Sequence, residues 1–187
     1  MTFMKQYSFA TIVSTAEDRP VATHLPFAVS VREEQIILTS HFARANPQWQ
    51  QLTGQEILVI FSEPHAYISP SHYDKEQNVP TWDYFAVHAY GTAKLITAYE
   101  AAISVLEEMI ITYEPAYKLQ WDGLPEGYKT KMVKGIAAFE ITVNSVQASK
   151  KLSQNKNDRE KQSMISQLSA SELSTERDIA KYMEQLK

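Results

Sequence analysis

The chain has 187 residues, 44% of them hydrophobic, and a formal net charge of −4 at pH 7. This size favours one domain with a proper core, and the acidic balance argues against nucleic-acid binding over the whole surface, because phosphate contacts need clustered Lys and Arg. The chain contains no cysteine, which excludes disulfides, thiolate catalysis and zinc–thiolate sites.

The absence of cysteine is compatible with a reducing cytoplasm, and we expect a cytoplasmic protein. No window of the sequence approaches the uncharged apolar length that spans a bilayer, so no membrane contact is expected. The first five residues lack the charged-then-apolar layout of a secretory signal.

Short β-strands are predicted over the first two thirds of the chain. A strand over residues 8–15 is rich in β-formers, and a turn at 16–19 separates it from an alternating strand over 20–29. Pro26 cannot donate to a sheet ladder, so this second strand should have an edge or a bulge there. The remaining predicted strands cover residues 35–40, 57–61, 84–96 and 135–146. Six strands with turn signals between them predict an antiparallel barrel.

Helices should interrupt this pattern. One or two turns over residues 45–52 have Asn46 as cap and Pro47 at the first helical position. Thr97 is the expected cap of a helix over 98–113, which has one apolar face, and a short helix is predicted near 125–133. After Lys150 the composition shifts to polar residues, with amphipathic helices over 158–168 and 175–186. We therefore expect a barrel domain over residues 1–150 and a helical extension over 151–187.

The middle of the chain concentrates aromatic, histidine, hydroxyl and proline residues between Pro64 and Gly91. Three prolines fix backbone angles there, and flat rings with hydrogen-bonding tips suit a pocket for a planar, polar-edged ligand. The alternative is a long ordered loop that packs its rings into the core, and residue chemistry alone leaves the two about even.

Other sites are weakly supported or excluded. None of the five histidines forms the His-Glu-x-x-His pair of a zinc site, and the spacing of His65, His72 and Asp74 matches no metal template, so no metal is expected. The sequence has no Gly-x-Gly-x-x-Gly, Walker loop or Gly-x-Ser-x-Gly elbow. The basic stretch 150–156 is expected to be solvated, with only weak support for DNA contact.

A phosphate site is suggested by the segment from Thr39 to Pro47. Thr39 and Ser40 offer hydroxyls, Arg44 offers a bidentate fork, and the following helix start offers free N–H groups. From spacing alone, a capped turn with a surface arginine is the favoured alternative.

Six stretches of the chain, taken together, resemble the PaiB family of FMN-binding negative transcriptional regulators. They occur in the family's order and are Ala22-Thr23-His24-Leu25-Pro26, Ala45-Asn46-Pro47-Gln48-Trp49, Pro64-His65-Ala66-Tyr67-Ile68-Ser69-Pro70, Val79-Pro80-Thr81-Trp82-Asp83-Tyr84, Val87-His88-Ala89-Tyr90-Gly91 and Lys151-Leu152-Ser153-Gln154-Asn155. The N-terminal segment is shorter than the family's, and Asp83 stands where Asn is more often expected. The resemblance implies an FMN-binding split β-barrel, mainly β with added helices, antiparallel and homodimeric.

The resemblance also implies roles for particular residues. Thr39, Ser40, His41 and Arg44 would hold the FMN phosphate, with Asn46 counted among the cofactor-binding residues. Ala22, Thr23, His24 and Leu25 would line the flavin ring. Trp82, Tyr84 and His88 would close the ring pocket, from the same subunit or the second one.

Two classes of function follow from this resemblance. The first is a negative transcriptional regulator, or repressor, with the flavin as ligand or redox sensor. The second is a flavin-dependent oxidoreductase or flavin reductase that uses NAD(P)H, with the hydride chemistry belonging to the cofactor. Haem binding on the same type of barrel is a minor third option. The sequence identifies no catalytic residue.

Overall fold

The computed structural model describes residues 1–185, which form two compact units. The first unit combines Met1–Phe61 with His88–Val146, and the second combines Ser62–Val87 with the chain from Gln147 onward. Two long strands, β7 (Thr81–Ile96) and β8 (Ile136–Lys151), contribute residues to both units.

The strands form one sheet of eight in the order β2-β1-β5-β7-β8-β4-β3, and β6 pairs with β7 outside this path. The further strands are β1 (Phe9–Ala16), β2 (Arg19–Pro26), β3 (Ala28–Arg32), β4 (Gln35–Ala43), β5 (Glu56–Phe61) and β6 (His65–Ile68). The registered pairs are antiparallel. Because β2 and β3 stand at opposite ends of the order, the sheet is open, which confirms the predicted antiparallel, mainly β architecture with added helices.

The predicted strand over 20–29 is wrong in one respect, because the chain leaves the sheet at Phe27. The Phe27 N–H donates to Ser8 O at 2.9 Å, and its fully buried ring lies edge-on to Phe61 and Phe139. Burial of this ring divides the segment into β2 and β3. The prediction from Pro26 is confirmed, since β2 is an edge strand.

The core of the first unit is aromatic and tightly packed. The Phe42 and Phe139 rings stack with centroids 5.2 Å apart, and both side chains are fully buried. On β7, a Cβ built on Gly91 would collide with Thr142 O and Ile141 Cγ2 of β8, so only glycine allows the two strands to approach this closely.

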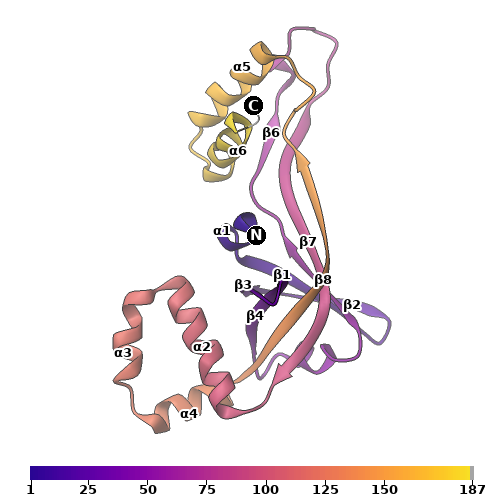
Figure 1. Ribbon diagram of the computed structural model, residues 1–187. Helices are drawn as coiled ribbons and strands as arrows, with labels where there is room; N and C mark the ends of the chain where they lie inside the picture. Colours follow the sequence, from indigo (N-terminus) through magenta and orange to yellow (C-terminus); the bar gives the residue numbers. More distant parts are fainter. Residues whose placement is uncertain (186–187) are drawn as a thin grey trace. The chain divides into compact units, whose positions relative to one another are not determined.

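The helices α2, α3 and α4 of the first unit lie between β7 and β8 in the chain, and Figure 1 shows them grouped together. The helices of this unit are α1 (Thr2–Gln6), the 3₁₀ helix η1 (Pro47–Gln51), α2 (Tyr99–Tyr113), the 3₁₀ helix η3 (Pro115–Tyr117), α3 (Lys118–Asp122) and α4 (Glu126–Lys134). Asn46 caps η1 as predicted, through a bond from Gln48 N. The predicted Thr97 cap of α2 is wrong, because Ala98 occupies the cap position and no side chain bonds there.

The second unit packs two helices against the β6 ribbon, and α5 and α6 lie beside β6 in Figure 1. These helices are α5 (Asp158–Ser169) and α6 (Ser174–Glu184), with the 3₁₀ helix η2 (Pro70–His72) between β6 and β7. Ile179 and Met183 of α6 join Ala66 and Ile68 of β6 in one buried cluster. The predicted end of the last helix, at Leu186, lies outside the described residues. Over residues 1–185, no helix has the length and apolar character needed to cross a membrane.

Candidate functional site

A hydrogen-bonded network centred on Gln48 joins η1 to the edge strand β2. Gln48 is 1% exposed, and its Oε1 accepts a bond of 2.6 Å from Thr23 Oγ1. Its Nε2 donates to Val21 O at 3.0 Å and to Ser14 Oγ at 3.1 Å. Asn46 completes the network, because its Nδ2 donates to Thr23 Oγ1 at 2.9 Å while its Oδ1 accepts from Gln48 N at 3.0 Å. The predicted site residues Thr23 and Asn46 therefore lie together, and their polar atoms hold the loop on the strand.

Arg44 lies next to this network with its charge exposed. Its guanidinium carbon is 4.9 Å from the centroid of the Trp49 ring, whose Nε1 donates to Arg44 O at 3.2 Å. Within residues 1–185, no ion pair joins Arg44 to a carboxylate. A guanidinium that is held on an aromatic ring and has no acidic partner is suited to binding an anion, phosphate above all.

The outer face of β2 presents a flat, partly apolar surface. Ala22 and His24 are exposed on it, and the His24 ring stacks on Phe9 of β1 with centroids 6.3 Å apart. Phe9 is 67% exposed. Leu25 and Thr23 face the opposite side by strand alternation. Because β2 is the end strand of the sheet, its outer backbone groups are available for hydrogen bonds with a ligand edge.

The predicted phosphate residues on β4 divide between its two faces. Ser40 points into the unit, and its hydroxyl donates to Pro26 O at 2.7 Å. Phe42 points the same way, and its ring is buried. Thr39 and His41 point to the other face. Thr39 Oγ1 and His41 Nδ1 are buried and have no hydrogen-bond partner in the described part of the chain.

Aromatic rings cover one face of the β6–β7 ribbon. The pairs His65–Tyr84 and Tyr67–Trp82 are opposite each other in the ladder, and the Tyr67 and Trp82 rings lie 5.7 Å apart. Trp82 is 54% and Tyr84 39% exposed. His88 is half-buried and lies on the part of β7 that belongs to the first unit. The other face of this ribbon packs in the interior of the second unit.

On that interior face lies a buried acid, Asp83, which is fully buried. Neither carboxylate oxygen has a partner of normal hydrogen-bond geometry among residues 1–185. Burial raises the pKa of Asp83, and the nearby Ser153 and Lys151 partly offset this effect. The acid belongs to the interior of the unit and is not positioned to act on a ligand at the surface.

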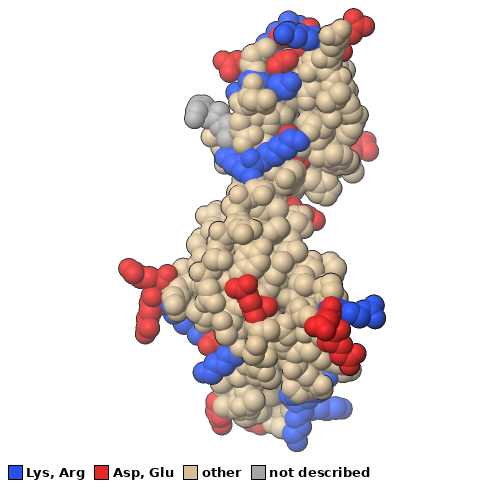
Figure 2. Space-filling view, turned by 90° about the vertical axis from the view of Figure 1, so that its right-hand side faces the viewer, with Lys and Arg blue, Asp and Glu red and all other residues tan. Residues whose placement is uncertain are grey.

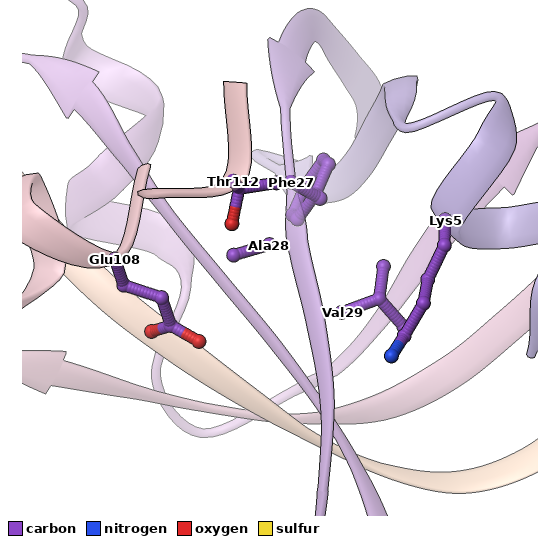
Figure 3. Close-up of a pocket in the computed structure, with 6 residues that line it drawn as sticks. All are labelled: Lys5, Phe27, Ala28, Val29, Glu108 and Thr112. Atoms are coloured by element: carbon purple, nitrogen blue, oxygen red, sulfur yellow. The ribbon is translucent and has the colours of Figure 1, made fainter. Parts of the chain in front are cut away.

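Three of the hollows within single units have a lining that does not include Arg44 or His24. The smallest, about 270 Å³, has Lys5 of α1 and Glu108 of α2 on opposite sides of β3, as Figure 3 shows. A hollow of about 420 Å³ in the second unit is lined by His72, whose Nδ1 is 3.2 Å from Ser163 Oγ. The third, about 360 Å³, lies under α2 and contains His41. Ala22 and His24, which are predicted for the flavin ring, form an exposed wall of the first unit together with Phe9.

Three residues of this wall were not predicted as site residues: Phe9, Gln48 and Trp49. Gln48 and Trp49 lie in one of the stretches that resemble the family, so the sequence located them near the site. The bonding role of Gln48 could not be predicted, because its partners lie 25 to 36 positions away along the chain. In the sequence, Phe9 is an ordinary strand residue, and its exposure follows only from the order of the strands in the sheet.

Comparison with known proteins identifies relatives in sequence and in fold. A family model described as a putative FMN-binding domain matches residues 1–145. The protease synthase and sporulation protein PAI 2 of Bacillus subtilis is 40% identical over 188 residues, covering 97% of this chain and 88% of that protein.

Two solved structures share the fold at low sequence identity. The flavocytochrome Anf3 of Azotobacter vinelandii superposes with a TM-score of 0.62 at 16% identity, covering 80% of this chain and 64% of that one. A FAD- and haem-binding protein of Mycobacterium smegmatis gives a TM-score of 0.61 at 16% identity, covering 80% and 68%. Both support the split-barrel architecture that the open sheet indicates.

Proposed function

The chain belongs to the PaiB family of FMN-binding proteins, and from this premise we propose that it is a homodimeric negative transcriptional regulator in which FMN serves as ligand or redox sensor. FMN is its cofactor, and when bound it supplies reversible electron and hydride chemistry. The family match over residues 1–145 supports placing the flavin-binding part within the predicted 1–150 domain and treating 151–187 as an extension.

The observation that carries the flavin site is the unpaired Arg44 beside the Gln48 network. Its guanidinium would bind the FMN phosphate, while the network fixes the turn that carries Arg44 against β2. The exposed His24, stacked on Phe9, would contact the isoalloxazine ring, and the outer edge of β2 at Ala22 to Leu25 would bond the polar edge of the ring. The assignments of Thr39 and Ser40 to the phosphate stay predictions. His41 lines the hollow under α2, whose lining does not include Arg44, and we do not propose it for the phosphate.

The test of this site is the FMN affinity of Arg44→Ala. A hydrogen bond to a charged group contributes about 1.5–3 kcal/mol, so the dissociation constant should rise roughly ten- to a hundredfold. Arg19→Ala, which removes an exposed arginine from the start of β2, is the matched control and should leave the affinity unchanged. Equal affinities of the two variants would remove Arg44 from the site.

The homodimer is proposed because a single chain supplies only one wall. A small-molecule site usually buries most of its ligand, yet Phe9 and Trp82 are 67% and 54% exposed. We assign Trp82 and Tyr84 to closing the flavin ring pocket of the second copy, and the corresponding role of His88 stays a prediction.

Mixing two defective variants tests this assignment. If Trp82 acts on the partner's flavin, a heterodimer of Arg44→Ala and Trp82→Ala chains contains one site with both residues intact. After subunit exchange, each heterodimer should bind one FMN tightly, which is about half a site per dimer averaged over an equimolar mixture in which about half of the dimers are heterodimers. If heterodimers form but tight FMN binding does not return, the assignment of Trp82 to the partner's flavin is contradicted. A monomer that binds FMN fully would contradict the dimer.

The regulatory role is supported by the family and by the relative named for protease synthesis and sporulation. Charged side chains of both signs are interspersed on the face shown in Figure 2, where uncharged atoms cover most of the surface, so a broad DNA footprint is not favoured. The proposal therefore gives direct DNA contact a minor part. A gel shift at physiological salt, with oxidised and with reduced FMN, measures binding to DNA. Steady NAD(P)H oxidation by the FMN-loaded protein would argue for an enzyme instead of a regulator.

A further inference from the structure

The hollow under α2, which we call the helix pocket, has the lining of a small-molecule site. It measures about 360 Å³ and lies within the first unit, between α2, α3 and α4 and the strands β4 and β8. Its walls include Leu106, Met109, Trp121, Tyr128 and Met132. Aromatic rings and methionine side chains give a polarizable, adaptable surface for flat apolar ligands.

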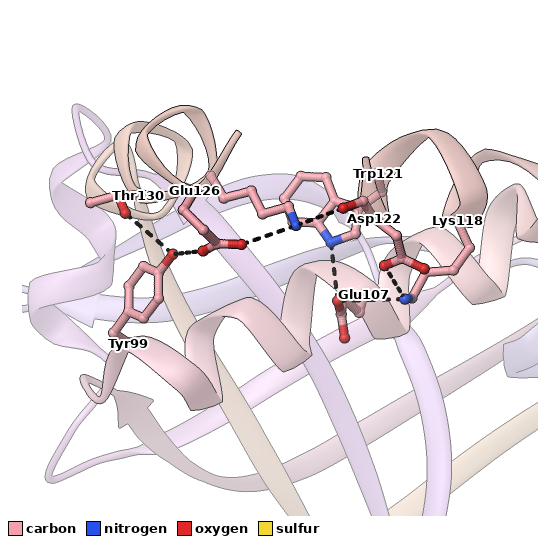
Figure 4. A network of polar contacts seen from close by, with 8 residues as sticks. Tyr99, Glu107, Lys118, Trp121, Asp122, Glu126 and Thr130 are labelled. Carbon is pink, nitrogen blue, oxygen red and sulfur yellow. Dashed lines mark hydrogen bonds and ion pairs between the residues drawn. The ribbon is translucent and has the colours of Figure 1, made fainter. Parts of the chain in front are cut away.

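The aromatic wall is held in place before any ligand arrives. Trp121 is 5% exposed, and its Nε1 donates to Glu107 Oε1 at 3.1 Å. The Lys129 ammonium lies 5.7 Å from the centroid of the Trp121 ring and 3.3 Å from Glu126 Oε1. Figure 4 shows this chain of contacts running on to Tyr99 and Thr130, so that α2, α3 and α4 are joined around the ring. A preorganised wall lowers the entropy that a ligand must lose on binding.

His41 gives the helix pocket a polar point. It lines the pocket from β4, and its Nδ1 is buried without a hydrogen-bond partner in the described residues. Burial lowers the pKa of His41, so the ring is neutral at pH 7. A neutral imidazole nitrogen is either a donor or an acceptor, according to the tautomer. A hydroxyl group satisfies both cases, because it can donate and accept.

We propose that the helix pocket is a second ligand site, separate from the flavin, that binds a bicyclic aromatic molecule carrying one hydroxyl group, which pairs with the imidazole ring of His41. The size fits this class, because small-molecule sites measure about 300–1,000 Å³, and this open pocket measures about 360 Å³. An anion is a poor occupant, since the side chains that line the pocket include no Lys or Arg. The site goes beyond the proposed function and does not depend on it.

The probes for the test are 1-naphthol and naphthalene, which differ by one hydroxyl. Equilibrium dialysis against the FMN-saturated protein should show saturable binding of both, with 1-naphthol bound about three- to tenfold more tightly, the range of one net hydrogen bond. In His41→Phe, naphthalene should still bind while the preference for 1-naphthol disappears. Retained naphthalene binding shows that the variant pocket is folded.

A blocking variant and its control locate the binding. Leu106→Trp should fill the pocket and abolish binding of both probes, whereas Ile111→Trp, on an exposed position of the same helix, should not. Absence of saturable binding, equal affinity for the two probes, or displacement of 1-naphthol by FMN would each overturn the proposal, the last because the pocket would then belong to the flavin site.

Discussion

Replacing Gln48 by leucine tests whether the network that holds η1 on β2 stabilises the protein. Leucine keeps the size of the side chain and removes its amide. The substitution deletes the bond of 2.6 Å from Thr23 and the bonds of 3.0 and 3.1 Å to Val21 O and Ser14 Oγ. Gln48 is 1% and Ser14 2% exposed, so water cannot readily replace these partners.

The expected loss follows from these three bonds. A neutral hydrogen bond contributes about 1 kcal/mol net, so their removal should lower the free energy of unfolding by about 3 kcal/mol. With a urea m value of about 2 kcal/mol per molar, the unfolding midpoint should fall by roughly 1.5 M. FMN binding should also weaken, because the bond from Asn46 Nδ2 to Thr23 Oγ1 then holds the turn carrying Arg44 on β2 without the support of the Gln48 side chain.

The assay is urea unfolding followed by far-ultraviolet circular dichroism, with Gln50→Leu as the matched control. Gln50 lies two residues away on η1 and is exposed, so its replacement should change the stability by less than about 0.5 kcal/mol. Indistinguishable midpoints for the two variants would refute the reasoning, since a buried, hydrogen-bonded amide would then contribute no more to stability than an exposed one.

Two further predictions concern single positions. Because burial raises the pKa of Asp83, the folded protein keeps a proton that the unfolded chain has lost, so stability should fall as pH rises above about 4; Asp83→Asn should remove this fall in urea midpoints measured between pH 4.5 and 7.5, and an unchanged slope would contradict it. Gly91→Ala should lower the free energy of unfolding by about 1–3 kcal/mol, because the new methyl group meets Thr142 O. Gly127→Ala, which adds a methyl group in open space on α4, should cost nothing, and equal losses would disprove the close-approach argument.

Local chemistry was sufficient to predict many elements of the fold. Richness in β-forming residues predicted β1, and alternation of side chains predicted β2. Asn46 followed by Pro47 predicted the start of η1, which is a 3₁₀ helix. The four-residue strand β6 escaped prediction, because Pro64 and Pro70 enclose it and its aromatic residues suited a loop equally well. Its strand character depends on pairing with Thr81 to Tyr84, and such a pairing is not visible in a local window.

The candidate site shows the same division between local and distant information. The segment from Thr39 to Pro47 suggested one anion site, with a capped turn and a surface arginine as the favoured alternative. Strand alternation separates Ser40 from His41, and a turn separates both from Arg44. Which face meets the core is decided by partners distant in sequence, such as Phe139 against Phe42. The motif therefore located the segment, while the roles of its members required the sheet.

The position of the proposed flavin site on an edge strand explains why the Gln48 network is buried although the site is open. An edge strand offers unpaired backbone groups to a ligand, but it is held by one neighbour only, here β1. The side chain of Gln48 bonds Val21 O and Thr23 on this strand, and so supplies part of the support that a second neighbouring strand would give. Because Asn46 belongs to the same network, the support for the ring-contacting strand and for the turn carrying Arg44 is shared. A ligand that bridges Arg44 and β2 would then meet two elements already fixed relative to each other, which is the condition for binding without a large ordering cost.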